Sequence, residues 1–482
     1  MTDFYNRYQE LKILKQKYDN LVSGELILLW GRRRLGKTEL IKKFLSKIKD
    51  NKLYFFVPIT EEKGIISQFQ EDIKKQKNVV LKITSWNDFF DFISEESEKH
   101  KLVVVFDEFQ RFNDGSPSFI SLLQNKWDDL LRKKKIMIIL CGSSMGMMHN
   151  LVLSSVGPLY GRTTVKIKLE AFRYADFRLM FKNLNPIQKV QYFSVFGGTP
   201  YYLSLAKKGN QNLIEKIYEL MIKVSGSLTD EPQNLLSWEL KHPVRYNAIL
   251  QAISKGKIEL TEISNFVGKE SMNVLPYIRN LNKLLNLISI SEPFSGKKRL
   301  TRYKISDNFF RFWYNFIFSN KSLIEVGNTE AVKSKIKVRL DSFIGHIFED
   351  IVKELFVLYN KNKIKNFNID FEEIGSWWGS KGEDVDIIMK GRTETIVCEV
   401  KWQDKRIDND TLTKLKENEE KMSNKGRVRY CLVSKSGFQE DLIKIMEKEN
   451  ILYLDLNEVD QLFKEYSEKE CVIQRKIIEN WG

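Results

Sequence analysis

The residues of this chain best suited to chemistry form the octapeptide GRRRLGKT, which spans residues 31–38 and fits the pattern G-x-x-x-x-G-K-[ST]. Its glycines let backbone N–H groups approach phosphate oxygens closely, and a helix that begins there favours an anion. Lys37 can reach the β- and γ-phosphates of a nucleotide, and the Thr38 hydroxyl can bind Mg²⁺. The octapeptide therefore predicts a phosphate-binding loop. A glycine-containing turn without a ligand is the alternative.

A pair of acids follows the apolar stretch VVVF and ends the segment VVVFDE at residues 103–108. A continuous apolar run is typical of a central parallel strand, and open α/β sheets bind ligands at the C-terminal ends of such strands. We expect Asp107 to hold Mg²⁺ and Glu108 to orient or activate the attacking water. A third strand, IMIILCG, precedes Ser143, which we expect to sense the γ-phosphate. An ordinary turn explains Ser143 equally well.

A second group of ionisable residues lies near the C-terminus. Asp386 belongs to the strand-like segment GEDVDIIMKG, and Glu399 and Lys401 belong to TETIVCEVKW. Alternate residues on a strand share a face, so Glu399 and Lys401 project together, and Asp386 on a neighbouring strand would complete a Mg²⁺ site able to cleave a phosphodiester. Glu349, in the helical stretch FIGHIFEDIVKELF, is a candidate further ligand. The alternatives are a degenerate, non-cleaving version of this site or an ion pair on an exposed strand.

The elements that must position these residues follow an α/β pattern in the first part of the chain. Strand-like segments alternate with helical stretches, which predicts a parallel sheet with helices on both faces. The expected strands are near residues 26–30, 53–57, 79–83, 102–106 and 136–141. Residues 170–235 have a helical pattern and are expected to form a small lid on this sheet domain.

The next segment changes in character. Helical patterns at 244–256, 260–268 and 271–288 precede a hairpin-like stretch, which predicts a winged helix-turn-helix. The hairpin is basic and would follow phosphates through Lys297, Lys298, Arg299, Arg302 and Lys304. The third helix could face DNA with Asn273, Tyr277, Arg279, Asn280 and Lys283. Docking of another protein is the alternative, since winged helices also serve that purpose.

The length and composition of the chain indicate its number of domains, its class of partner and its compartment. The 482 residues, 42% of them apolar, suggest about three domains, which we place at 1–235, 236–325 and 326–482. The net charge of +15 favours a polyanionic partner, although excess lysine is also compatible with an ordinary solvated surface. Four scattered cysteines indicate neither a zinc site nor a disulfide framework. No apolar run is long enough for a membrane span and no signal segment stands out, so we expect a cytoplasmic protein without a membrane partner.

Taken together, these segments resemble the archaeal-type ATPases, a branch of the P-loop signalling and AAA+-like NTPases. The similarity is carried by FYNRYQEL, GRRRLGKTEL, VVVFDEFQRF, PLYGRT and FGGTPYYL. The C-terminal segments IGHIFEDIV, EIGSWW, GEDVDIIM and CEVKW are similar to PD-(D/E)xK, restriction-endonuclease-like folds. The resemblance thus implies a P-loop ATPase domain, a winged helix and a nuclease-like α/β domain.

The resemblance also implies the cofactors ATP and Mg²⁺. The nucleotide-binding residues would be Gly31, Arg32, Arg33, Arg34, Leu35, Gly36, Lys37, Thr38, Glu39, Asp107, Ser143 and Arg162. Arg162 would act as a γ-phosphate sensor or finger, whereas the three arginines of the loop could contact phosphates, neighbouring domains or solvent. Asp386, Glu399 and Lys401 match the nuclease core, and Glu349 matches its first-helix acid.

The function predicted from the sequence is ATP binding and hydrolysis by a protein that acts on DNA and carries a Mg²⁺-dependent nuclease. The alternative is an ATP-driven signalling or regulatory switch whose nuclease-like domain serves only for docking. DNA is the expected partner, and a homo-oligomer or a protein partner is compatible with the same residues.

Overall fold

The computed structural model describes residues 4–49, 51–209, 212–294, 300–379, 382–422 and 426–479, with the side chains described up to residue 469. The chain divides into two compact units. The first comprises residues 1–171, 237–241 and 474–482, and the second comprises residues 172–236 and 242–473.

The first unit contains a five-stranded sheet that is parallel throughout, with the strand order β2-β3-β4-β1-β5. Its strands are β1 (Glu25–Trp30), β2 (Asn51–Phe56), β3 (Leu102–Asp107), β4 (Ile136–Gly142) and β5 (Val165–Lys168). Every residue of β3 and β4 is buried, because these strands are apolar on both faces and lie inside the sheet. The predicted parallel sheet is therefore confirmed.

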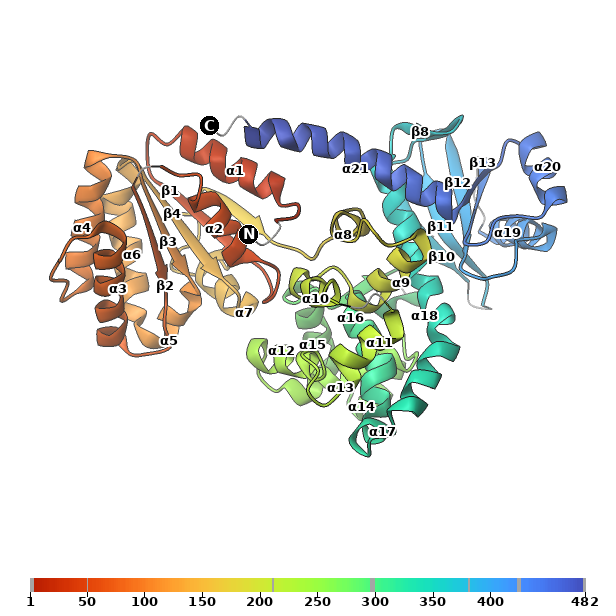
Figure 1. The fold of residues 1–482 in the computed structure, drawn as a ribbon, viewed down its shortest axis with the longest axis horizontal. Helices are drawn as coiled ribbons and strands as arrows, with labels where there is room; N and C mark the ends of the chain where they lie inside the picture. The colour runs from red at the N-terminus through yellow and green to blue at the C-terminus, as the bar shows by residue number, and fades with distance from the viewer. Residues whose placement is uncertain are drawn as a thin grey trace. The chain divides into compact units, whose positions relative to one another are not determined.

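Helices cover both faces of this sheet (Figure 1). One face packs against α1 (Tyr8–Asp19) and α2 (Lys37–Leu45), and the other against α3 (Glu62–Lys77), α4 (Trp86–Lys99) and α6 (Pro117–Asp129). Shorter helical segments complete the unit, namely η1 (Phe109–Arg111), α5 (Phe112–Gly115), η2 (Leu131–Lys133), α7 (Met145–Met148) and η3 (His149–Leu153).

One predicted strand of this unit is wrong and one strand was missed. Residues 79–83 form no strand, because Val79 and Val80 are exposed to solvent and only Ile83 is buried in the connection between α3 and α4. A short β-branched run without a buried face does not make a strand. Strand β5 was not predicted, since its sequence VKIK offers a single buried residue, Ile167.

The helical segment 172–236 groups with the second unit, whereas the sequence predicted it as a lid within a first domain ending at residue 235. It contains α8 (Tyr174–Met180), α9 (Pro186–Phe196), α10 (Pro200–Ala206), α11 (Leu213–Ile217), η4 (Tyr218–Ile222) and the start of α12 (Glu231–Glu239). The side chain of Glu354 accepts hydrogen bonds of 2.9 Å from the first backbone amides of α8, those of Tyr174 and Ala175. This capping fixes α8 to the second unit. The three-domain division stays a prediction.

Three helices and an antiparallel hairpin follow. They are α13 (Pro243–Ser254), α14 (Leu260–Val267), α15 (Ser271–Lys283), β6 (Ile288–Ser291) and β7 (Arg302–Ile305). Three of the predicted wing residues, Lys297, Lys298 and Arg299, lie outside the described residues. The aromatic segment after the hairpin is helical and largely buried, in α16 (Asn308–Phe312) and η6 (Trp313–Ile317).

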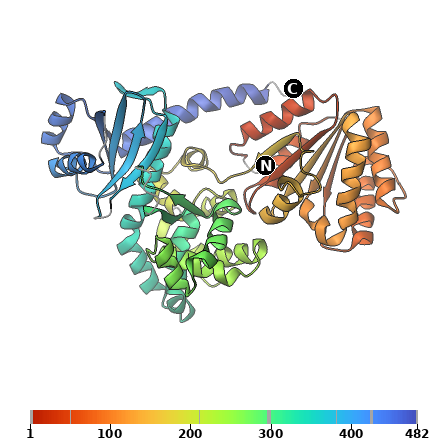
Figure 2. The ribbon, with the colours of Figure 1, turned by 180° about the vertical axis from the view of Figure 1, so that it is seen from behind.

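The rest of the second unit is α/β. The long helix α18 (Thr329–Leu358) packs against a sheet of order β10-β11-β12-β13-β14 (Figure 2). Strands β10 (Glu373–Trp378), β11 (Asp384–Lys390) and β12 (Glu394–Lys401) are antiparallel, whereas β13 (Arg427–Ser434) and β14 (Leu452–Asp455) continue in parallel. The remaining elements are η7 (Phe318–Asn320), α17 (Lys321–Glu325), β8 (Asn362–Ile364), β9 (Phe367–Ile369), α19 (Asn409–Lys421), α20 (Glu440–Lys448) and α21 (Leu456–Glu479).

The cysteines and the longest helices complete the description. The thiols Cys141, Cys398 and Cys431 are free and buried. In the described part of the chain, no helix combines the length and the apolar character that a membrane crossing requires.

Candidate nucleotide site and acidic cavity

The loop between β1 and α2 has a backbone that favours glycine at two positions. Gly36 has a φ of 87° and no atom within 4 Å of an added Cβ, so open space lies in front of it. A Cβ on Gly31 would lie 2.6 Å from the carbonyl oxygen of Leu169. The loop is also braced by Arg7, whose guanidinium donates to the carbonyl oxygens of Leu35 at 3.3 Å and Glu170 at 2.5 Å.

Lys37, the first residue of α2, is buried within this loop. Its ammonium donates hydrogen bonds to the carbonyl oxygens of Gly31 at 2.7 Å and Arg32 at 3.1 Å. Burial lowers the pKa of Lys37, and the nearby groups of Cys141 and Glu108 oppose this shift. The loop therefore holds a buried cation next to its glycines, and phosphate binding requires such a cation.

Thr38 and Asp107 meet as the sequence predicted. The Thr38 hydroxyl donates to Asp107 Oδ2 at 2.9 Å, and the same oxygen accepts a hydrogen bond of 2.7 Å from Tyr54. A hydroxyl and a carboxylate in contact beside a phosphate cradle are the oxygen donors that suit Mg²⁺, so these residues fit the expected ion. Tyr54, on the neighbouring strand β2, was not predicted.

Glu108 follows β3 in a left-handed backbone conformation, with a φ of 60° and a ψ of 40°. Its Oε2 accepts hydrogen bonds from Ser143 Oγ at 2.8 Å and from Gln110 Nε2 at 2.5 Å. In this structure Ser143 therefore positions Glu108, and its role as a γ-phosphate sensor stays a prediction. Gln110 is a further positioning residue that sequence reasoning missed.

We expect Glu108→Gln to bind ATP with unchanged affinity but to hydrolyse it about 100-fold more slowly, because the amide keeps the side-chain shape and cannot accept a proton from water. Single-turnover hydrolysis and nucleotide binding, measured on the same preparation, check this. Hydrolysis at the wild-type rate by this variant would show that Glu108 has no role in the reaction.

Other residues predicted to bind nucleotide have identifiable partners. Arg32 is buried in the loop, and Glu39 faces solvent on α2, where it pairs with Lys42 at 3.3 Å. Arg162 binds Asp128 with its Nη2 at 2.6 Å and its Nε at 3.0 Å. The structure thus brings Arg162 to Asp128 rather than to the loop, and its role as a sensor or finger stays a prediction.

Arg33 and Arg34 contact a segment that no sequence pattern linked to the loop. Their guanidinium groups lie 5.2 Å and 5.8 Å from the ring centre of Trp238, near the end of α12. Arg33 Nε is buried and lies 3.7 Å from Glu239 Oε1, but it makes no hydrogen bond to any residue that the structure describes. A buried donor of this kind beside the cradle fits an anionic ligand.

The second site is built on β11 and β12. Asp386 accepts a hydrogen bond of 2.8 Å from the backbone amide of Val400, and Glu399 pairs with Lys401. Burial raises the pKa of Asp386 well above its usual range, and the charges of Glu399 and Glu349 raise it further. Burial also raises the pKa of Glu399, with Lys401 opposing. The predicted cluster is therefore assembled, and its carboxylates repel one another.

Among the described residues, no group of three or more His, Cys, Asp or Glu side chains is arranged to hold a metal ion. Glu349, on α18, contacts His346 at 3.1 Å and does not complete a three-carboxylate set here, so its role as a ligand stays a prediction. Asp386 and Glu399 remain as two carboxylates. This number fits Mg²⁺, which often takes one or two protein carboxylates and completes its shell with phosphate oxygens and water.

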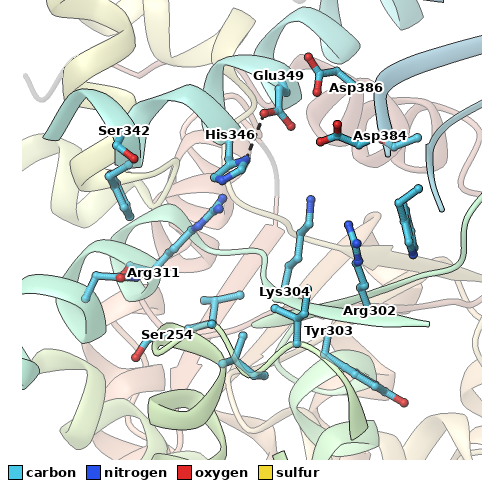
Figure 3. A pocket seen from close by; sticks show the side chains of 18 of the residues that line it. Ser254, Arg302, Tyr303, Lys304, Arg311, Ser342, His346, Glu349, Asp384 and Asp386 are labelled. Atoms are coloured by element: carbon cyan, nitrogen blue, oxygen red, sulfur yellow. Dashed lines mark hydrogen bonds and ion pairs between the residues drawn. The ribbon is translucent and has the colours of Figure 1, made fainter. Parts of the chain in front are cut away.

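A cavity of about 370 Å³ adjoins this cluster within the second unit (Figure 3). Glu349, Asp384 and Asp386 line one side, and Arg302 and Lys304 of β7 extend toward them from the opposite side. Arg311 and Arg339 add two more cations, and the aromatic lining includes Tyr303, Phe343, Trp377 and Trp378. We call this the acidic cavity. It combines cations that bind phosphate with carboxylates that bind a metal ion.

The predicted DNA-facing residues of α15 divide into two groups. Asn273, Arg279 and Lys283 are exposed. Asn280 instead donates to the Tyr246 hydroxyl at 2.9 Å, and Tyr277 packs edge-on against the Tyr246 ring. These two side chains contact α13 and therefore stabilise the helix pair.

Comparisons with known proteins agree with this geometry. Residues 4–206 match a family described as an ATPase domain predominantly from Archaea, and residues 313–421 match one described as archaeal and bacterial proteins of unknown function. The uncharacterised protein MJECL04 of Methanocaldococcus jannaschii is 30% identical over 406 residues, which is 83% of this chain and 88% of that protein. The uncharacterised ATP-binding protein MJ0423 of the same organism is 49% identical over 53 residues, 11% of this chain and 88% of that protein.

Among solved structures, the Walker-type ATPase PABY2304 of Pyrococcus abyssi superposes with a TM-score of 0.50 and 20% identity, covering 65% of this chain and 96% of that one. This similarity concerns the fold alone. The parallel sheet and its phosphate-binding loop define a P-loop ATPase. The chain belongs to the family of archaeal ATPases that includes the M. jannaschii protein MJECL04.

Proposed function

We propose that this ATPase acts on DNA and that the acidic cavity is a Mg²⁺-dependent nuclease site. The observation that carries the proposal is the composition of the cavity, in which Asp386 and Glu349 lie opposite Arg302 and Lys304. A phosphodiester needs cations for its oxygens and carboxylates for the metal ion that activates it. The net charge of +15 supports the same class of partner.

The fold around the cavity supports a PD-(D/E)xK type of site. Helix α18 precedes three antiparallel strands, and α19 then crosses over to β13, which pairs in parallel with β12. Asp386 and Glu399 would hold Mg²⁺, which when bound supplies Lewis-acid polarisation and a more acidic water. Lys401 pairs with Glu399 and would orient it or contact the phosphate.

Helices α13–α15 and the hairpin β6–β7 support a winged helix as the DNA-binding element. Its second strand, β7, contributes Arg302 and Lys304 to the cavity wall. Burial lowers the pKa of Arg302, with Asp384 and Glu259 opposing, because this guanidinium lies over the Trp378 ring rather than in open solvent. The hairpin would therefore lead a strand toward the carboxylates.

The size of the cavity favours a single strand over a duplex. The cavity of about 370 Å³ is at the small end of ligand pockets, which measure roughly 300–1,000 Å³. A single strand exposes its bases, and aromatic walls bind such bases by stacking. The walls of this cavity include Tyr303, Phe343 and Trp377.

The test is cleavage of matched single-stranded and blunt duplex oligonucleotides by the full-length protein, with Mg²⁺ or with EDTA, and with ATP, ADP or no nucleotide. We expect Mg²⁺-dependent cleavage that is at least about tenfold faster on the single strand. Equal cleavage of both substrates would contradict the single-strand preference and leave the nuclease site intact.

A regulatory switch is the second candidate, and the burial of the acidic cluster favours it. Asp386 and Glu399 have raised pKa values because they are buried, and Lys401 already pairs with Glu399. A closed cluster of this kind could serve as a docking fold without cleavage. Absence of cleavage of any single-stranded or duplex DNA or RNA, in every nucleotide state, would support this candidate.

A further inference from the structure

The C-terminal end of α12 lies against the phosphate-binding loop. Residues 237–241 belong to the first compact unit, although α12 begins in the second. The guanidinium groups of Arg33 and Arg34 lie 5.2 Å and 5.8 Å from the ring centre of Trp238, which stays 46% exposed. Glu239 follows it and brings a carboxylate to the same loop, with Oε1 3.7 Å from Arg33 Nε.

Glu239 is surrounded by the groups that would receive a nucleotide. Its side chain is only 1% exposed, and within the described residues neither carboxylate oxygen makes a hydrogen bond of normal geometry. Arg33 and Lys37 of the loop, Glu108 after β3 and the backbone amide of Met145 on α7 all act on its charge. The carboxylate is thus an anion at the cradle, attracted by its cations and not locked by hydrogen bonds.

The surroundings of Glu239 disfavour the ionised form of its side chain. Burial raises the pKa of Glu239 to about 7, and Glu108 raises it as well, whereas Arg33, Lys37 and the Met145 amide lower it. A carboxyl in water has a pKa of about 4.3. Glu239 would therefore ionise more readily if it left the loop for solvent.

We propose that the Glu239 carboxylate occupies the place of a nucleotide phosphate in the nucleotide-free protein, and that nucleotide binding displaces the end of α12. Both anions depend on the same two cations, Arg33 and Lys37. A triphosphate brings several negative charges to a buried position beside a carboxylate, where like charges repel strongly. Binding of the nucleotide and docking of Glu239 are therefore mutually exclusive.

This competition gives α12 a role in the ATPase cycle. Residues 231–236 of the helix belong to the second unit, whereas Trp238 and Glu239, near its end, contact the phosphate-binding loop. When nucleotide binds, release of Trp238 and Glu239 would detach the end of α12 from the phosphate-binding loop. Because a ligand shifts a two-state equilibrium only through its differential affinity, the competing carboxylate supplies the coupling that such a change needs.

The first test compares Mg²⁺–ATP binding to the wild-type protein and to Glu239→Gln by calorimetry. We expect about tenfold tighter binding to the variant, because removal of the competing charge raises the fraction of protein that is competent to bind. Asp230→Asn is the matched control, since Asp230 precedes α12 and pairs with Lys321 at 3.8 Å. Equal or weaker binding to Glu239→Gln, with the control unchanged, would overturn the proposal.

Proton exchange provides a readout that a merely structural role would not produce. At pH 7 a carboxyl with a pKa of about 7 is half protonated, so its transfer to water should release about half a proton for each nucleotide bound. Calorimetry in buffers of different ionisation enthalpy measures this as the difference between wild type and Glu239→Gln. Proton uptake would mean that Glu239 stays buried beside the phosphates, and it would overturn the displacement.

Discussion

Lys37→Ala should lose ATP hydrolysis to below about one hundredth of the wild-type rate and should bind ATP at least tenfold more weakly. The reason lies in the position of the ammonium, which is buried in the loop and held by the carbonyl oxygens of Gly31 and Arg32. It is the cation that can reach the β- and γ-phosphates. Its removal deletes charge-assisted hydrogen bonds that strengthen as negative charge shifts in the transition state.

The variant needs a check on folding, because two loop carbonyls lose their donor. Circular dichroism and thermal unfolding provide it. Lys42→Ala is the matched control, since Lys42 lies on the same helix, is exposed and pairs with Glu39. Turnover by Lys37→Ala at the wild-type level would refute the assignment of the loop, and loss of turnover in the control would point to the helix rather than to the phosphate contact.

Asp386→Asn should abolish Mg²⁺-dependent DNA cleavage, with a loss of at least about 100-fold, and should leave ATP hydrolysis unchanged. The amide keeps an oxygen that can accept the hydrogen bond from Val400, so the strand pair is preserved. It removes the negative charge that would bind the metal ion. Glu373→Gln is the control, because Glu373 is an exposed acid at the start of β10 and does not line the cavity.

The same variant has an expected effect on stability that is independent of cleavage. Burial raises the pKa of Asp386 in the folded protein, and Glu399 raises it further. An acid with a raised folded pKa destabilises the protein as pH rises and the group is forced to ionise. Asp386→Asn should therefore unfold at a higher temperature than wild type at pH 8, and this gain should shrink toward pH 4. Retained cleavage in a variant with this stability gain would exclude Asp386 as a metal ligand.

Much of the first unit could be predicted from the sequence because its signals are local. The segments of β3 and β4 are nearly continuous apolar runs. Such runs are typical of central parallel strands, because these strands are buried on both faces. The loop residues 31–38 and the acids Asp107 and Glu108 carry their chemistry in their spacing. The contact between Thr38 and Asp107 confirms that the two segments meet.

The missed residues lie where the contact is long-range. Nothing in the sequence SWELK predicts that Trp238 and Glu239 return to arginines some 200 residues earlier. Tyr54 reaches Asp107 because β2 and β3 are neighbours, a pairing that no local pattern encodes. Gln110 could have been noticed in the segment FDEFQ, but its contact with Glu108 depends on the turn between them.

In the second unit, local patterns predicted some contacts, whereas other contacts depend on how distant elements pack. The strand period placed Glu399 and Lys401 on one face, and their contact is present. The pattern did not predict that β7 and α18 would enclose the carboxylates in a cavity, because that depends on how separate elements pack. The strand predicted at residues 79–83 is wrong for a different reason. The prediction rested on local β-propensity, but Val80 is exposed and the segment has no buried face.

The backbone of Glu108 has a consequence for how this family can change. A left-handed conformation suits glycine and costs other residues about 1–2 kcal/mol, and Glu108 adopts it with a φ of 60°. A mutation to glycine would relieve that cost and would remove the carboxylate at the same time. If Glu108 activates the attacking water, as predicted, a change to glycine would stabilise the turn and lose hydrolysis, so only selection for the reaction would keep a glutamate there.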